Sequence, residues 1–413
     1  MTLWQGAPAG GDTEMSMRTF LVSLWCVCSL VPWSSAWDEC TSAVVGPAGS
    51  AASAPLLWKN RDTGELANKV VFVADEPYSY VGLVDASAPS GRHVYAGLNE
   101  VGFAIINTVA YNLPAPAGGE LEDLEGIIMA DALRGCRTVD DFERYLAANL
   151  GPDLGAWSNF GVIDGEGGAR LYEVHNNGFE RIEVTGLPRS LLVNTNFARS
   201  GEQGTGAGYL RHERASALFA GLGEAPVEWP VILQRFTRDL GHPLLDHPSW
   251  QELAEAPATP PLWVSTKDTI DKDATSAAVV IVGRRPGEAW PPATMWVIPG
   301  EPVTAVAVPL WVEAAASPTL LWQGEEAAMW RESMRLKRIA RPFPELEKEK
   351  YLDLTRLDNA DGTGFLPGLL AAEAEVLEAT RAFLAEPRSS EELARFSEEM
   401  AALAYRALQA AGS

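Results

Sequence analysis

The chain has 413 residues, 47% hydrophobic and 21% charged, which is the composition of a globular protein with a substantial core. Its formal net charge is −23, from 32 basic and 55 acidic residues, which argues against nucleic acid or an anionic membrane surface as a partner. The five histidines and four cysteines form no CxxC or HxxxH pair, so we expect no metal site of the zinc or iron–sulfur kind.

The N-terminus has the features of a secretory signal. An apolar run, residues 19–33, follows a basic residue and precedes the small residues 34–36, the order found around a signal cleavage site. We predict a signal peptide over residues 1–36, in which the stretch before Met15 or Met17 looks dispensable. The run is too short for a stable membrane anchor. The sequence therefore predicts an exported protein, periplasmic or extracellular.

The following 280 or so residues alternate between strand-like and helix-like patterns. Short apolar runs separated by turns predict strands between residues 40 and 110, with a hairpin turn at Asn99–Gly102. The later segments are two helices within 123–150, a hairpin and a strand within 157–196, helices over 211–221 and 229–240, a proline-rich loop over 241–261, and strands over 275–282, 294–298 and 303–312.

Beyond residue 315 the periodicity is helical. We predict helices over 325–339, 369–384 and 391–408, the last preceded by a capping box at 389–392. Hairpin signals dominate and βαβ signals are missing, so the pattern favours an α+β fold of antiparallel sheets covered by helices. We expect one domain over residues 40–314 and a helical C-terminal extension over 315–413.

Signal cleavage would leave two cysteines, Cys40 and Cys136. One interpretation is a disulfide between them, which an oxidising compartment permits, in a non-catalytic exported binding protein. The other is that Cys40 is a nucleophile. It lies three residues after the predicted cleavage site, so removal of a short propeptide, residues 37–39, would make it the N-terminal residue.

An N-terminal cysteine carries both the nucleophile and its base. The α-amino group has an ordinary pKa of about 8 and can accept the thiol proton, so no histidine partner is needed. Signal peptidase is not expected to cut directly before Cys40, because Trp37 and Glu39 would occupy positions that need small side chains. We therefore expect the chain to remove residues 37–39 itself.

A polar cluster, Lys59-Asn60-Arg61-Asp62, directly follows a predicted apolar strand. One interpretation is a solvated charge cluster at a strand end. The other is that Asp62 holds the α-amino group of Cys40 while a cation orients the substrate or the thiol. On this second interpretation Lys59, Asn60 and Arg61 are candidate substrate-binding residues.

These features together resemble the opening of the N-terminal-nucleophile (Ntn) cysteine hydrolases of the linear-amide class. That class includes the penicillin V acylase/bile salt hydrolase and isopenicillin N acyltransferase families, with secernin-type dipeptidases as cousins. Two further stretches are similar to it: Gly97–Ala104 followed by Asn107, and Val193–Phe197 with Arg211 downstream. The resemblance covers about residues 40–312 and leaves the C-terminal helices outside.

The resemblance implies roles for individual residues. Cys40 matches the nucleophile, and Asp62 matches the aspartate that hydrogen-bonds its amino group. Arg211 matches a structural or catalytic arginine. The bile salt hydrolases carry arginine where this chain has Lys59, so the resemblance does not specify the acyl group.

Asn107 and Asn196 match asparagines on the oxyanion side, and Asn194 is a rival for Asn196 because the match can be shifted by two residues. The resemblance implies a four-layer αββα fold and hydrolysis of a small-molecule linear amide through a thioester acyl-enzyme, without a cofactor. An amide acyltransferase or a dipeptidase on the same fold is the alternative.

Overall fold

The structure is a computed structural model that describes residues 39–114, 124–343 and 350–412. The predicted signal peptide, residues 1–36, and the first two residues of the predicted propeptide lie outside these ranges. Within them, no helix is long and apolar enough to cross a membrane.

The first sheet has six antiparallel strands in the order β10-β1-β2-β12-β13-β14. They are β1 (Glu39–Val45), β2 (Leu56–Asp62), β10 (Leu191–Asn194), β12 (Thr275–Val282), β13 (Thr294–Ile298) and β14 (Val308–Leu310). All seven residues of β2 are buried, because this strand lies between two neighbours and both of its faces are covered. The inner strands of this sheet therefore offer a site shielded from water.

The second sheet has seven antiparallel strands that pair in chain order, from β3 to β9. They are β3 (Asn68–Val73), β4 (Tyr80–Asp85), β5 (Ala96–Asn99), β6 (Ala104–Val109), β7 (Trp157–Ile163), β8 (Ala169–His175) and β9 (Gly178–Glu183). The predicted hairpin turn joins β5 to β6, where the N–H of Gly102 donates to the carbonyl of Asn99 over 3.0 Å. Gly102 has φ +89°, a conformation that favours glycine.

The helices are α1 (Glu125–Gly135), α2 (Val139–Asn149), α3 (Tyr209–Ala220), α4 (Trp229–Val231), α5 (Trp250–Glu255), α6 (Ala328–Ala340), α7 (Leu366–Phe383) and α8 (Ser390–Ala410). A π-helical segment, Ile232–Phe236, continues α4. The predicted capping box is formed at the start of α8, where Ser389 and Glu392 each accept the other's backbone N–H.

The structure differs from the predicted elements in several places, and one of them is β4, where no strand was predicted. The predicted loop over 241–261 contains α5. Just after it in the chain, β11 (Trp263–Ser265) pairs with the distant β15 (Tyr351–Asp353) in a small antiparallel sheet. The predicted strand over 303–312 is extended only at Val308–Leu310, because a 3₁₀ turn over Pro302–Thr304 precedes it.

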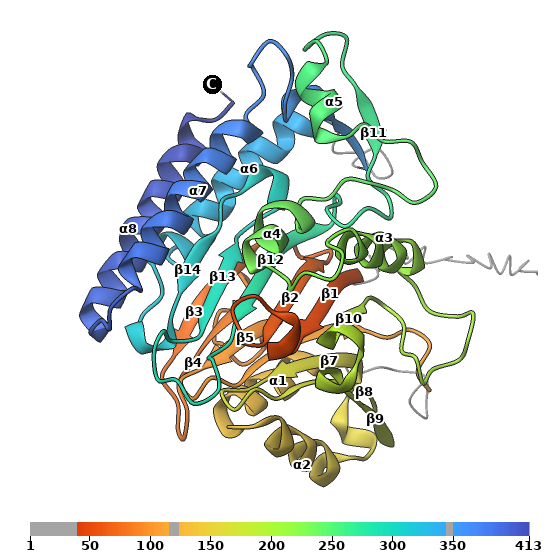
Figure 1. Cartoon of the computed structure of the whole chain (residues 1–413), viewed down its shortest axis with the longest axis vertical. Coiled ribbons are helices and arrows are strands. Elements are labelled where there is room, and N and C mark those ends of the chain that lie inside the picture. The colour runs from red at the N-terminus through yellow and green to blue at the C-terminus, as the bar shows by residue number, and fades with distance from the viewer. Residues whose placement is uncertain (1–38, 115–123, 344–349, 413) are drawn as a thin grey trace, which may run out of the picture. The chain divides into compact units, whose positions relative to one another are not determined.

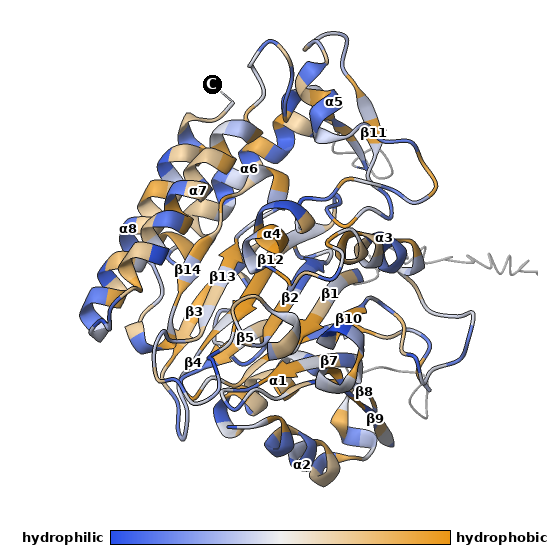
Figure 2. Ribbon diagram, in the orientation of Figure 1, coloured by the Kyte–Doolittle hydropathy of each residue, from blue (hydrophilic) through white to orange (hydrophobic). Residues whose placement is uncertain are grey.

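The helices and sheets of Figure 1 form four layers. Three hydrophobic cores lie between these layers. Val44, Leu57 and Val279 of the six-stranded sheet face the seven-stranded sheet in one core. The outer face of the seven-stranded sheet packs against α1 and α2. The outer face of the six-stranded sheet packs against α3, the π-helical segment, α7 and α8. The strands carry most of the apolar colour in Figure 2, as expected for sheets covered on both faces. The expected α+β, four-layer αββα arrangement is confirmed.

The C-terminal helices share the core of the sheets. Helix α8 lies beside β14, the edge strand of the six-stranded sheet (Figure 1). Glu373 of α7 is fully buried and accepts from Arg238 over 3.0 and 2.7 Å and from the N–H of Ala307 over 2.8 Å. These helices therefore cover a sheet edge that would otherwise expose unpaired backbone groups.

Candidate active site

Cys40 is the second residue of β1 and is 4% exposed. Opposite residues of an antiparallel pair have their side chains on the same face of the sheet. Cys40 pairs with Arg61 and Ser42 with Lys59, so the side chains of Cys40, Lys59 and Arg61 share the face that looks toward the seven-stranded sheet. Glu39 pairs with Asp62 on the alternate face.

A narrow pocket opens at the thiol, and its walls come from both sheets. Its lining residues are Cys40, Lys59, Arg61, Asp62, Tyr95, Asn107 and Val109. The structure thus brings together five of the residues expected from the sequence to act at one site.

The cations of this pocket are held by oxygen atoms and by an aromatic ring. Lys59 Nζ donates to Asn107 Oδ1 over 2.6 Å and to the carbonyl of Tyr95 over 2.9 Å. The Arg61 guanidinium forms an ion pair with Asp85 at 2.8 Å and lies 3.8 Å from the centre of the Tyr95 ring. Because its oxygen accepts from Lys59, the amide nitrogen of Asn107 is oriented away from that cation.

The backbone of Cys40 is fixed by residues far along the chain. Its N–H donates to Asn196 Oδ1 over 2.8 Å. The buried Arg211 of α3 donates to the same Asn196 oxygen over 2.8 Å and to the carbonyl of Cys40 over 2.6 Å. Asn196 Nδ2 donates to the carbonyl of Val109 over 2.9 Å. Three donor–acceptor pairs thus determine which way the Asn196 amide faces.

Asp62 is fully buried at the end of β2, and Thr275 Oγ1 donates to its Oδ1 over 2.7 Å. Burial raises the pKa of Asp62 to about 7, although Lys272, Arg211 and the hydrogen bond from Thr275 act to lower it. A carboxyl group with a pKa near neutrality can both accept and return a proton at physiological pH.

The pKa of Glu39 is shifted in the opposite direction to that of Asp62. Burial acts to raise the pKa of Glu39, but Arg211 and Lys272 outweigh it, so this pKa lies below its ordinary value. Glu39 Oε2 lies 2.5 Å from Lys272 Nζ and 3.4 Å from Arg211.

Two of the expected site residues lie elsewhere. The side chain of Asn60 is on the opposite face of β2 from the pocket, where it donates to the carbonyls of Thr237 and Ile270 and accepts from Trp58 Nε1. We therefore no longer count Asn60 among the substrate-binding candidates. Asn194 is also committed to the protein interior, because its amide nitrogen donates to Thr108 Oγ1 over 2.8 Å. Between the two rival asparagines, Asn196 is the one that contacts Cys40.

The two described cysteines are not joined in a disulfide. Cys40 belongs to the six-stranded sheet, whereas Cys136 lies in the core between the seven-stranded sheet and the helices α1 and α2. The structure therefore does not contain the bridge on which the binding-protein interpretation depends.

Three polar residues at the site were not expected from the sequence: Tyr95, Lys272 and Thr275. Tyr95 was part of a predicted strand, and its place beside Arg61 depends on how β4, β5 and β6 pair. Lys272 and Thr275 lie in and just after the turn before β12, in a stretch with no recognisable motif. Only the pairing of β12 with β2 brings them to Asp62.

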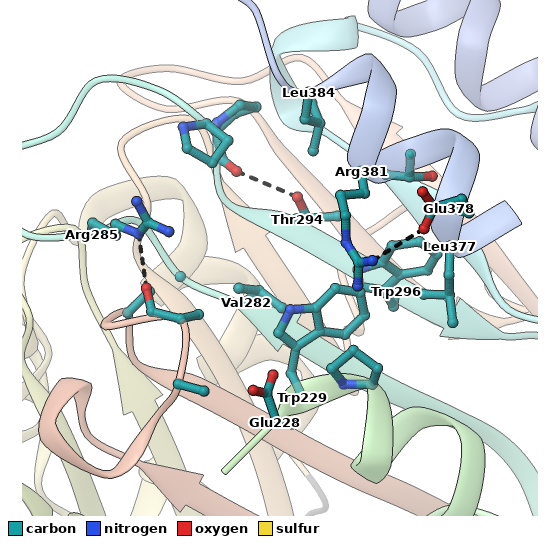
Figure 3. A pocket seen from close by; sticks show the side chains of 18 of the residues that line it. Glu228, Trp229, Val282, Arg285, Thr294, Trp296, Leu377, Glu378, Arg381 and Leu384 are labelled. Carbon is teal, nitrogen blue, oxygen red and sulfur yellow. Dashed lines mark hydrogen bonds and ion pairs between the residues drawn. The ribbon is translucent and has the colours of Figure 1, made fainter. Parts of the chain in front are cut away.

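A larger cavity, of about 620 Å³, lies at the other end of the same sheet (Figure 3). Val282 in its wall pairs with Leu56 at the start of β2, whereas Asp62 ends that strand. The rings of Trp229 and Trp296 stack in it with centroids 5.1 Å apart, and Glu378 and Arg381 of α7 pair beside them. Its wall contains no cysteine or histidine, so the smaller pocket at Cys40 is the better candidate for nucleophilic chemistry.

Comparisons with protein-family models and with curated proteins gave no match. Among solved structures, the chain is similar to a penicillin V acylase from Agrobacterium tumefaciens, with 14% identity, a TM-score of 0.39, and coverage of 65% of this chain and 85% of that one. It is also similar to an N-acylethanolamine-hydrolyzing acid amidase ortholog from Caenorhabditis elegans, with 15% identity, a TM-score of 0.38, and coverage of 60% and 94%. A variant of a conjugated bile acid hydrolase from Clostridium perfringens matches with 10% identity, a TM-score of 0.35, and coverage of 63% and 89%.

No group of three or more histidine, cysteine or carboxylate side chains suited to a metal ion occurs in the described part of the chain.

Proposed function

We propose that this protein is an exported, self-processing cysteine hydrolase that cleaves a linear amide C–N bond, with Cys40 as nucleophile and the α-amino group of the same residue as base. The proposal is carried by one observation: Asn196 and Arg211 converge on the backbone nitrogen and carbonyl of Cys40 while its side chain lines a pocket with Asp62.

Processing would change the chemistry of Cys40 at its nitrogen. Hydrolysis of the Glu39–Cys40 peptide bond converts the amide N–H held by Asn196 into an amino group. That group carries a lone pair and lies two bonds from the carbon that bears the thiol, so it can take the thiol proton. Asp62 is among the residues that line the same pocket, and its buried carboxylate would stabilise the protonated amine.

The catalytic cycle follows from these groups. The thiolate adds to the carbonyl carbon of the substrate amide, and the carbonyl oxygen takes up the negative charge. The protonated amine of Cys40 gives its proton to the leaving nitrogen, the C–N bond breaks, and a thioester remains on the sulfur. Water then attacks the thioester, yielding the carboxylic acid and restoring the thiol.

Amide donors beside the pocket suit the oxyanion. Asn107 and Asn196 both present side-chain nitrogens close to pocket-lining residues: Asn107 lines the pocket itself, and Asn196 Nδ2 binds the carbonyl of Val109. A donor directed at the developing oxyanion contributes on the order of 3 kcal/mol to the transition state. Asn196 holds the nitrogen of Cys40 with its oxygen, so its amide group would serve both the nucleophile and the oxyanion.

The substrate is a small-molecule amide. Lys59 and Arg61 lie in the pocket wall beside the thiol and would contact the bound acyl group or the leaving amine. If an amine in place of water accepts the acyl group from the thioester, the same site performs acyl transfer.

Mass measurement tests the proposal. Purified wild-type protein should begin at Cys40, whereas Cys40→Ala should retain Glu39. Iodoacetamide should add one alkyl group to Cys40 and abolish hydrolysis of a panel of linear amides. Hydrolytically active protein that begins upstream of Cys40, or Cys40→Ala that loses Glu39 at the wild-type rate, would contradict the proposal.

A further inference from the structure

The peptide bond between Glu39 and Cys40 is held on both sides in the unprocessed chain. On the amine side, the N–H of Cys40 donates to Asn196. On the acyl side, the Glu39 carboxylate lies 2.5 Å from Lys272 Nζ and 3.4 Å from an Arg211 nitrogen. The side chains of Glu39 and Lys272 are 22% and 12% exposed, so this ion pair is largely withdrawn from water.

Lys272 sits in a turn that is itself fixed to the site. The N–H of Lys272 donates to Thr275 Oγ1 over 3.0 Å, and the N–H of Thr275 donates to the carbonyl of Lys272 over 3.0 Å. The hydroxyl of Thr275 in turn donates to Asp62. One short turn thus joins the carboxylate of Glu39 to the carboxyl group of Asp62.

We infer that Lys272 is a positioning residue for self-processing, because it holds the Glu39 carboxylate and thereby fixes the acyl side of the bond that Cys40 cleaves. This inference rests on the proposed function. Ion pairing in a partly buried site is stronger and more directional than at the surface, because both charges have lost part of their hydration. Glu39, the last residue of the proposed propeptide, is therefore held in place for cleavage.

The Cys40 sulfur adds to the carbonyl carbon of Glu39, and the thiol proton passes to the nitrogen of Cys40. The C–N bond breaks, leaving Glu39 attached to the sulfur as a thioester and the nitrogen as a free amine. Water hydrolyses the thioester, which releases the Glu39 carboxylic acid and regenerates the thiol. Lys272 takes no proton in this sequence and acts only on the position of the Glu39 carbonyl.

The experiment is a double-mutant cycle on the full chain. Four chains are expressed: wild type, Lys272→Met, Glu39→Gln and the double variant. Intact-mass measurements over time give the rate at which each chain loses the residues before Cys40. We expect each single variant to process roughly tenfold more slowly, the factor that corresponds to about 1.4 kcal/mol. The double variant should be no slower than Glu39→Gln alone, and Lys272→Arg should restore most of the rate.

Lys267 provides a matched control. It lies in the same loop region and adds only a weaker long-range field at Glu39, so Lys267→Met should process at a rate close to that of wild type. Thermal unfolding of the same variants in the Cys40→Ala chain, which should stay unprocessed, separates positioning from loss of the fold.

The outcomes distinguish this inference from the function on which it rests. A wild-type chain that never begins at Cys40 overturns both. Normal processing by Lys272→Met overturns only the role of Lys272. The role of Lys272 is also overturned if Lys272→Met slows processing by the same factor in the wild-type chain and in the Glu39→Gln chain. The lysine would then act without the Glu39 carboxylate.

Discussion

The buried carboxyl group of Asp62 makes the stability of the unprocessed chain depend on pH. Its pKa is about 7 in the folded chain, against an ordinary value of 3.8. The difference is about 3 pKa units, and at about 1.4 kcal/mol for each unit it corresponds to about 4 kcal/mol. The folded chain binds this proton more tightly than the unfolded chain. The protonated carboxyl group therefore makes its full contribution to the free energy of unfolding below a pH of about 4. That contribution is lost as the pH rises through about 7.

The measurement compares Cys40→Ala, which should stay unprocessed, with Cys40→Ala/Asp62→Asn. We expect the free energy of unfolding of the first chain to fall relative to the second by about 4 kcal/mol between about pH 4 and about pH 8. Urea titrations at several pH values measure both chains, and every other titrating group is common to the two. A difference that does not change with pH, or that changes in favour of the Asp62 chain as the pH rises, would refute this account of Asp62.

Processing should reverse part of this effect. The Glu39 carboxylate helps to raise the pKa of Asp62, and it departs when the chain is cut. The new ammonium group of Cys40 adds a positive charge nearby, which favours the ionised carboxylate. We therefore expect the pKa of Asp62 to be lower in the processed protein than in the unprocessed one.

Three further predictions concern residues outside the reaction itself. Glu373→Gln leaves the buried Arg238 without its carboxylate and should lower the free energy of unfolding by about 3–5 kcal/mol, measured in urea. Asn60→Ala should lower the free energy of unfolding by about 1–3 kcal/mol, because it removes buried hydrogen bonds, but it should leave KM unchanged. A raised KM with unchanged stability would show that Asn60 contacts the substrate. Burial raises the pKa of Cys136 to about 12, so peptide mapping after iodoacetamide treatment at neutral pH should find Cys40 alkylated and Cys136 intact.

The fold was predictable where local signals were strong. The hairpin at Asn99–Gly102 and the capping box of α8 depend on neighbouring residues only, and both were identified. Strand β4 was missed because Gly82 interrupts it and weakens the strand pattern. Helix α5 was missed although its capping box, Ser249 with Glu252, is present in the sequence. The prolines around this short helix led to the interpretation of the whole segment as a loop.

The candidate site was predictable where its residues lie on the first two strands or in the two stretches similar to the amide hydrolases, which contain Asn107 and Asn196. Cys40 and Asp62 were recognisable from their spacing along the chain. The alternation of side chains along β2 already separates Lys59 and Arg61 from Asn60, and this signal was available before the structure. Lys272 was not predictable, because a lysine in a turn has no pattern of its own and reaches Glu39 only when β12 pairs with β2.

The support for Cys40 comes from residues that are translated long after it. Asn196 lies 156 positions further along the chain, and Arg211 follows on the next helix. On the proposed function, a chain that has not yet brought β10 and α3 against β1 lacks the contacts that support removal of residues 37–39. A chain that still carries the propeptide would therefore be one that has not finished folding. Only fully folded molecules would become active.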